Sequence, residues 1–297
     1  MPDTFFTAAP HWRWLIVLYF FIGGMAGGSF VLAALLDLFG KPQDRPIVRT
    51  GYYVACLGAV ISGMLLTADL GRPERFWHML IQSERGLPMF KYWSPMSVGA
   101  WGLMLFGGFA VLATLGALHE TGRMRWTLLQ SLHGGVLGSL IAVLGGLCGF
   151  FLAGYTGALL SVTNRPLWAD TTWLGLLFLS SGTSTAAALL MLLGVQRGVR
   201  TSATVHWLSR MDRGTLLLEL LALIILTVSL GPALRVWMNG WGVLLLIGVV
   251  FAGILLPLCL EWRPRLLGRL SLPAGAVLVL LGGFLLRVVV VLSSEGV

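Results

Sequence analysis

Long apolar segments limit what this protein can fold into more than any other feature of its sequence. Eight of them reach the roughly 20 residues that an α-helix needs to cross a bilayer. They cover residues 14–38, 48–70, 95–118, 128–155, 172–195, 214–236, 241–261 and 272–292. In lipid, every backbone N–H and C=O must be hydrogen-bonded inside the protein, which a helix achieves within one segment. The sequence therefore predicts an all-α integral membrane protein, one polytopic domain over residues 1–297, with its eight transmembrane helices packed as two four-helix bundles.

Composition agrees with this fold class. Charged residues make up 11% of the 297 residues and hydrophobic residues 57%, whereas a soluble domain carries about 25% charged residues. The net charge of +8 would indicate nucleic-acid binding in a soluble protein. Here the basic residues lie in short connections between apolar segments, so we expect a lipid bilayer and no nucleic acid as partner. The first segment is too long for a signal peptide and is expected to stay as a helix.

The distribution of Lys and Arg predicts the orientation. These residues are more numerous in the connections after odd-numbered spans than in those after even-numbered spans. Because cytoplasmic loops are enriched in Lys and Arg, we expect a protein of the cytoplasmic (inner) membrane with both termini outside. The connection 71–94 is the longest and carries four cations on the outer side, which indicates that it docks an anion or another protein.

The sequence offers little for a metal or haem. Its cysteines, Cys56, Cys148 and Cys259, are isolated and form no CxxC pair. A bis-histidine haem needs histidines in facing helices, and only His133 falls within an expected span. We therefore expect no haem, no iron–sulfur cluster and no metal site in this protein.

Asp69 ends the second span, and Arg72 and Arg75 follow it closely. A carboxylate at that depth is costly unless it is paired or faces a polar cavity. Asp69 is thus either the anchor of a helix end or a functional group, and the two arginines are candidates for its counter-charge. A second carboxylate, Glu219, lies in the sixth span, where it either relays protons or pairs with Arg213 or another cation. Both alternatives stay open.

Other polar groups near the spans allow more than one role. Arg287 lies deep in the eighth span and is expected to pair with a carboxylate or with carbonyls. Tyr19, Tyr155, Trp12 and Trp168 lie near outer helix ends, where aromatic side chains commonly anchor a protein at the bilayer surface. A phenol, a carboxylate and an exposed glycine backbone would also suit a quinone, whose carbonyls need hydrogen-bond donors.

Four short motifs follow one another in the expected spans. They are GGMAGG at 23–28 in the first, DLGRP at 69–73 ending the second, SPMSVGAW at 94–101 opening the third, and YTG at 155–157 closing the fourth. Together they resemble the polysulfide reductase/NrfD family of membrane quinone subunits. The resemblance covers nearly the whole sequence, including eight spans and outward termini.

The resemblance implies an anchor subunit that holds no cofactor of its own and is not catalytic alone. It would exchange electrons between quinone (menaquinone or ubiquinone) and an extracytoplasmic ferredoxin-like 4Fe–4S subunit, itself bound to a molybdopterin catalytic subunit. The positions that line the quinone in the family match Tyr19, Leu70, Gly71 and Tyr155. Some relatives have histidine where this protein has Tyr19. Because a phenol is a poor proton carrier near neutral pH, the proton role is expected to fall to Asp69, whose charge Arg72 would set, or to His78.

Two other functions remain open at this point. The protein is alternatively a proton-translocating or solute-transporting module with Glu219 and Arg287 on an internal path, or a purely structural membrane anchor. A transporter is expected to move substrate alone, whereas a quinone-reactive subunit is expected to be silent without its partner.

Overall fold

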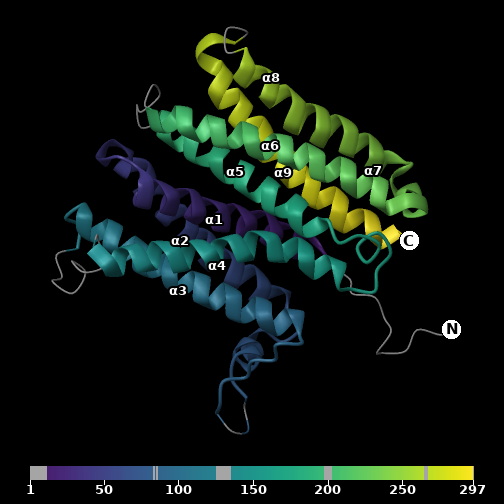
Figure 1. Cartoon of the computed structure of the whole chain (residues 1–297). Coiled ribbons are helices and arrows are strands. Elements are labelled where there is room, and N and C mark those ends of the chain that lie inside the picture. The colour runs from purple at the N-terminus through teal and green to yellow at the C-terminus, as the bar shows by residue number, and fades with distance from the viewer. Residues whose placement is uncertain are drawn as a thin grey trace.

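The apolar segments fold into long helices that lie side by side (Figure 1). The structure is a computed structural model that describes residues 12–82, 84, 86–124, 135–196, 203–263 and 267–296. Its α-helices are α1 Trp14–Phe39, α2 Arg45–Asp69, α3 Pro95–Glu120, α4 Gly135–Ser161, α5 Leu174–Gln196, α6 Ala203–Leu230, α7 Gly240–Val243, α8 Leu256–Trp262 and α9 Ser271–Leu292. A π-helical segment, Leu244–Leu255, joins α7 to α8. Short 3₁₀ turns cover Pro42–Asp44, Pro73–Met79, Gly231–Trp237, Gly268–Leu270 and Ser293–Gly296.

The expected membrane spans are confirmed. Eight helical stretches within the described residues are long and apolar enough to cross a bilayer, α7, the π-helical segment and α8 together forming the seventh. Most observed ends lie within a few residues of the expected ones. Residues 128–134 of the fourth expected span, as well as His133 in it, lie outside the described residues.

Two expected boundaries are wrong. The sixth helix starts at Ala203 and not at residue 214, because its first turns are polar and resemble a loop in sequence. Asp212 is nevertheless 1% exposed, since it faces other helices and not water. The fourth helix continues to Ser161, so Tyr155 does not close it. Gly157 is instead a contact point: a Cβ on it would lie 2.1 Å from the carbonyl oxygen of Leu174 on α5.

The helix contacts fall into two groups of four spans. In the first, α1 and α3 each pack against α2 and α4; in the second, α5 packs against α6 and α9, and α9 against the seventh span. The groups meet where α5 packs on α1 and α4. Accordingly, two thirds of the most apolar part of α1 and of α5 is buried, against one third for α2 or α4. These two helices form the centre of the molecule.

Glycines set the close contacts of α1. A Cβ on Gly27 would lie 2.4 Å from the carbonyl oxygen of Gly149 on α4, and one on Gly28 would lie 2.7 Å from that of Gly182 on α5. Small residues let helix backbones approach closely in lipid, where dispersion contacts and hydrogen bonds drive association. The glycines of the first span thus allow close packing on two of its faces, one against α4 and one against α5.

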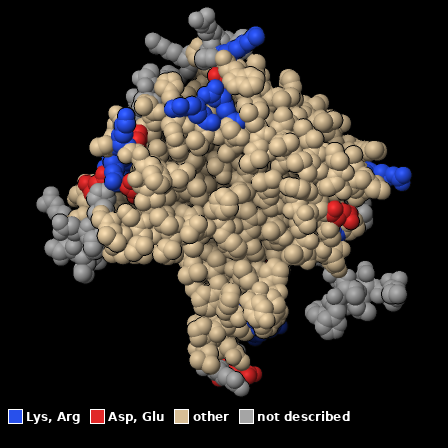
Figure 2. All heavy atoms as spheres, viewed as in Figure 1, with Lys and Arg blue, Asp and Glu red and all other residues tan. Residues whose placement is uncertain are grey.

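The surface is consistent with a membrane setting. Figure 2 shows that charged side chains on this face lie near the ends of the helices and at the tip of a projecting segment, with an uncharged region between them. The start of α1 and the end of α9 lie at the same end of the helices (Figure 1), as an even number of spans requires. The molecule is therefore a multi-pass membrane protein.

Gly27→Ala is expected to destabilise the protein, because the added methyl group would overlap the Gly149 carbonyl. Overpacking of this kind costs about 1–3 kcal/mol. The matched control is Gly107→Ala on α3, where nothing lies within 4 Å of the added Cβ. Thermal unfolding of the detergent-solubilised protein should show a lower midpoint for Gly27→Ala alone. Equal midpoints for both variants would contradict the packing argument.

Candidate functional site

The predicted site residues lie at the end of the bundle where α1 begins and α2 ends. Tyr19 on α1 and Tyr155 on α4 are buried, with exposed fractions of 2% and 9%. The remaining predicted residues at this end are Asp69, Gly71 and Arg72, which are exposed, and Leu70 and His78, which are half-buried. Glu219 is 3% exposed in the middle of α6, in the other helix group. The structure therefore gathers the tyrosines and residues 69–72 at one end and separates Glu219 from them.

Tyr155 is held by the motif that opens α3. Its hydroxyl donates a hydrogen bond of 2.6 Å to the carbonyl oxygen of Pro95. A Cβ on Gly99 would lie 2.2 Å from that hydroxyl oxygen, so only glycine leaves room for the phenol. The ring also stacks on Phe151 at a centroid distance of 5.3 Å. The hydroxyl proton of Tyr155 is therefore used in a hydrogen bond to the backbone. This favours a positioning role for Tyr155 over donation of a hydrogen bond to a ligand.

Tyr19 is in the opposite situation. Among the described residues its hydroxyl has no hydrogen-bond partner, and Tyr155 is the group that acts on it electrostatically. The Oγ of Ser62 on α2 is also buried and without a partner in the described part of the protein. Ser62 Oγ and the Tyr19 ring both lie 3.4 Å from the point where a Cβ on Gly23 would stand. Two buried polar side chains thus adjoin at the α1–α2 contact, and the Ser62 hydroxyl lacks the partner that such groups normally have.

The counter-charge of Asp69 comes from an unexpected residue. Asp69 is the last residue of α2, where the helix dipole disfavours a negative charge. The cation that acts on it is Arg13, which precedes α1. Arg72 and Arg75 are exposed, and no ion pair with Asp69 is formed by either within the described residues. The sequence alone did not suggest Arg13, because the two residues come together only when α1 packs against α2.

The connection 70–94 projects from this end as a compact arm (Figures 1 and 2). A 3₁₀ turn covers Pro73–Met79, and Ile81 and Pro88 form an antiparallel bridge. Backbone hydrogen bonds of 2.9 and 2.8 Å, from Gln82 to Leu87 and from Met89 to Leu80, close the arm. Its exposed large apolar side chains are Phe76, Trp77, Ile81, Leu87, Phe90, Tyr92 and Trp93. A patch of this kind marks an interaction surface.

Two tryptophans at this end are core residues and not interfacial anchors. Trp12 and Trp168 stack at a centroid distance of 5.3 Å and are 8% and 0% exposed. The indole N–H of Trp168 donates to the carbonyl oxygen of Val290 at 2.7 Å. The connection between α4 and α5 thereby covers the end of α9, a contact that composition did not reveal.

A buried polar network occupies the second helix group. Arg287 donates to Ser181 Oγ at 2.6 Å and to the carbonyl oxygen of Gly283 at 2.7 Å, which confirms the expected pairing with carbonyls. Glu219 is hydrogen-bonded to Ser181 and acted on by Arg287, not by Arg213. Arg213 lies instead 3.4 Å from Glu261. Glu261 and Asp212 were missed, since both lie at the edges of apolar segments.

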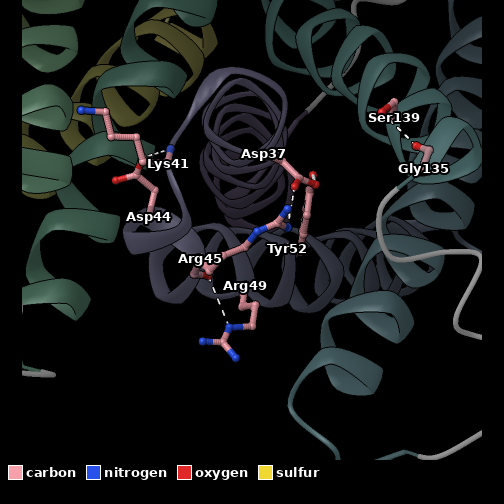
Figure 3. Close-up of polar contacts among 8 residues, drawn as sticks. All are labelled: Asp37, Lys41, Asp44, Arg45, Arg49, Tyr52, Gly135 and Ser139. Carbon is pink, nitrogen blue, oxygen red and sulfur yellow. Dashed lines mark hydrogen bonds and ion pairs between the residues drawn. The ribbon is translucent and has the colours of Figure 1, made fainter.

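A surface crevice lies at the opposite end of the first helix group, with about 310 Å³ of space that includes open solvent. In Figure 3 the Asp37 carboxylate accepts hydrogen bonds of 2.7 Å from Arg45 and 2.8 Å from Tyr52. None of the predicted site residues lines this crevice. Among the described residues, no group of three or more His, Cys, Asp and Glu side chains is placed to hold a metal ion.

A family model described as "Polysulphide reductase, NrfD" matches residues 4–295. The chain belongs to this family. It is 30% identical to Protein NrfD of Escherichia coli (strain K12) over 96% of its own length and 95% of that protein. It is also 26% identical to a component of the polysulfide reductase of Wolinella succinogenes, over 74% of its own length and 70% of that protein. A shorter match, 28% identity over 34% of its length, is to a component of the selenate reductase of Mesobacillus selenatarsenatis.

NrfD-family membership agrees with the resemblance of the four motifs, and the structure gives several of them a physical reason. The glycines at 23–28 permit the close helix contacts of α1, and Pro95 and Gly99 hold Tyr155. The DLGRP motif ends α2 and begins the projecting arm.

The two tyrosines are expected to differ in their contribution to stability. Tyr155→Phe loses the hydrogen bond to Pro95 and should destabilise the protein by about 0.5–1.5 kcal/mol. Tyr19→Phe removes a hydroxyl that has no partner in the described structure and should leave stability unchanged or slightly raised. Thermal unfolding of both variants in detergent checks this, and a larger loss for Tyr19→Phe would contradict the assignment.

Proposed function

We propose that this protein is the quinone-reactive membrane subunit of a respiratory oxidoreductase complex. In this role it exchanges electrons between quinone or quinol and a peripheral iron–sulfur subunit. The observation that carries the proposal is the buried Tyr19 side chain beside the unpaired Ser62 hydroxyl, at the helix end where the apolar arm projects. A quinone needs hydrogen-bond donors within an otherwise apolar pocket, and these two groups supply them.

Each site residue has a specific role in this proposal. Tyr19 donates to a quinone carbonyl, while Tyr155 fixes the wall behind it through its bond to Pro95. Leu70 and Gly71 cover the quinone ring. Nothing lies within 4 Å of the position that a Cβ on Gly71 would take, which leaves space for a ligand there.

Proton exchange in the proposal uses the carboxylate at the end of α2. Reduction of a quinone to the quinol takes up two electrons and two protons. Asp69 exchanges these protons, with Arg13 as its counter-charge. His78, whose ring lies 3.8 Å from that of Trp77 between centroids and is tilted by 55° to it, extends the exchange toward the surface. Arg72, exposed three residues after Asp69 in the sequence, adds positive potential at the mouth of the site.

The arm 70–94 is the proposed docking surface for the partner. Aromatic side chains dominate binding energy at protein interfaces, and Tyr92 and Trp93 are 77% and 67% exposed on it. The proposed partner is a ferredoxin-like 4Fe–4S subunit, which in turn binds a molybdopterin catalytic subunit. Two relatives are named as one subunit or chain of a larger reductase, one of a polysulfide reductase and the other of a selenate reductase. The arm and both termini then face the outside of the cytoplasmic membrane.

Asp69→Asn in the assembled complex is expected to slow quinol turnover by about 10²-fold or more, as for loss of a general acid–base group. Assembly should be normal, because Asp69 is exposed and lies at a helix end. The control is Asp170→Asn at the same end, an exposed carboxylate that accepts a hydrogen bond from the Leu167 N–H at 2.9 Å. Turnover at the wild-type rate in Asp69→Asn would remove this residue from the mechanism. Absence of any quinone or quinone-site inhibitor binding would favour a structural anchor.

Replacing Tyr92 and Trp93 together by alanine is expected to weaken capture of the iron–sulfur subunit about tenfold or more, as for loss of interface hot spots. The matched control is Phe39→Ala, an 81% exposed aromatic at the other end of the bundle. Affinity for the purified partner can be measured with the membrane subunit in nanodiscs. Equal affinities for both variants would place the docking surface elsewhere.

A further inference from the structure

The first two turns of α3 make contacts on two different faces. The helix begins after Ser94, whose side chain accepts a hydrogen bond from the Ser97 N–H at 3.4 Å. In an α-helix, residues three or four positions apart share a face, whereas residues two positions apart point about 200° away from each other. Ser97 and Trp101 therefore share one face. Gly99, two positions from each of them, lies on the nearly opposite face.

The glycine face of α3 holds two aromatic rings of α4. A Cβ on Gly99 would overlap the phenol of Tyr155, and one on Gly102 would lie 2.5 Å from Cε1 of Phe151. The two rings stack on each other, and the Tyr155 hydroxyl donates to the carbonyl oxygen of Pro95 at 2.6 Å. The place of the Tyr155 ring is therefore set by where α3 begins.

The other face of α3 holds the part of the arm that returns to the bundle. The indole N–H of Trp101 donates to the carbonyl oxygen of Met89 at 3.1 Å, and the Lys91 N–H donates to Ser97 Oγ at 3.1 Å. The ring of Phe90 meets that of Trp101 edge-on at a centroid distance of 6.3 Å. This part of the arm is therefore fixed to the same two turns that hold the rings of α4.

The most exposed aromatic side chains of the arm lie within this short connection. Tyr92 and Trp93 are 77% and 67% exposed and directly precede Ser94. Trp93 is two residues from Pro95, whose carbonyl oxygen holds the Tyr155 hydroxyl. Hydrogen-bonded side chains and rigid helical turns transmit a displacement from one site to another. A protein bound at these aromatic side chains therefore acts on the segment that places Tyr155.

Stability of the arm alone does not account for this arrangement. Trp101 and Ser97 belong to the same helical turns as Gly99, so a shift of their side of α3 also shifts the surface against which Tyr155 packs. Ser97 is 9% exposed and its hydroxyl serves the arm and not another helix. The start of α3 is thus one rigid piece between the docking surface and the wall of the site.

We propose that Trp101 and Ser97 are positioning residues that couple occupancy of the arm to the site beside Tyr19. A partner bound on the arm orders the start of α3 and thereby the Tyr155 ring, so that a quinone meets a wall already in place. Ordering by one ligand lowers the cost of binding for a second that needs the same order. The identity of the two ligands rests on the proposed function, whereas the link between the arm and Tyr155 does not.

The coupling has a consequence for electron exchange. Because coupling between two binding sites is reciprocal, a bound quinone favours docking of the iron–sulfur subunit by the same factor by which the subunit favours the quinone. The membrane subunit alone then binds quinone weakly. Quinone is held where its redox partner is present.

The link between the arm and Tyr155 is tested by thermal unfolding of the full-length protein in detergent, which needs neither quinone nor partner. Trp101→Phe removes the indole N–H and keeps an aromatic ring, and Tyr155→Phe removes the hydroxyl. The double variant should lose less in unfolding midpoint than the sum of the single losses, because both groups hold the same two turns. Tyr155→Phe with Trp237→Phe, whose indole N–H donates to Ser293 Oγ at 2.9 Å in the second helix group, should be additive. Additive losses in both pairs overturn the link.

The coupling is tested with the full-length protein in nanodiscs. Affinity for a quinone-site inhibitor of the hydroxyquinoline N-oxide class is measured with and without the purified iron–sulfur subunit. The subunit is expected to raise this affinity about fivefold or more, and the inhibitor to raise affinity for the subunit equally. Trp101→Phe should bring both factors close to one. Ser97→Ala, which removes the acceptor of the Lys91 N–H, should lower them and covers the case that Trp101→Phe does not fold. The control Trp262→Phe, 63% exposed at the end of α8, should keep the wild-type factors.

Two results overturn the coupling. One is independent binding of inhibitor and subunit in the wild-type protein, and the other is a wild-type factor in both Trp101→Phe and Ser97→Ala. A change that only disturbs the arm lowers affinity for the subunit and leaves the factor unchanged, so the two effects are distinct. A protein that binds no inhibitor even with the subunit bound refutes the proposed function, and the unfolding experiment then decides the link by itself.

Discussion

The structure depends on one constraint: lipid offers no hydrogen bonds, so each polar group in a span must find its partner inside the protein. Most buried groups meet this requirement across helices. Trp168 donates to the Val290 carbonyl, Tyr155 to the Pro95 carbonyl and Arg287 to the Gly283 carbonyl. Against this background the buried hydroxyls of Ser29, Tyr53 and Ser62 are exceptions among the described residues, and that of Ser62 lies next to the Tyr19 ring. A ligand gains most binding free energy where it can hydrogen-bond to buried groups that have no partner in the protein.

Close packing at the centre of the molecule sets how the two helix groups lie relative to each other. The glycines of α1 bring it against α4 on one face and against α5 on another. The first contact belongs to the helix group that holds the tyrosines, and the second belongs to the group that holds the buried charges. Arg287 packs against Gly24 of α1. The central helix thus lies between the tyrosines and the buried charges.

Much of the fold was predictable from sequence because hydropathy is a property of each segment alone. The eight spans, the small-residue contacts of α1 and the projecting arm after α2 followed from composition and order. The start of α6 did not, because its polar first turns are buried by other helices. The hydrogen bond of Tyr155 was also not predictable, since its partner Pro95 lies on another helix. Asp69 and Arg72 were singled out by their position at the end of a span, whereas Leu70 and Gly71 came from the family resemblance; the functions of all four are proposals.

The sequence by itself determined that this is an eight-span NrfD-family membrane protein and which helix ends carry Tyr19 and Asp69. The tertiary structure decided the partners: Arg13 for Asp69, Ser62 beside Tyr19, and Ser184 for Asp212. The reason is physical. Spans of nearly uniform hydrophobicity do not encode how far each helix is rotated about its axis. That rotation, fixed by glycine contacts and by the need to satisfy buried polar groups, selects which side chains meet.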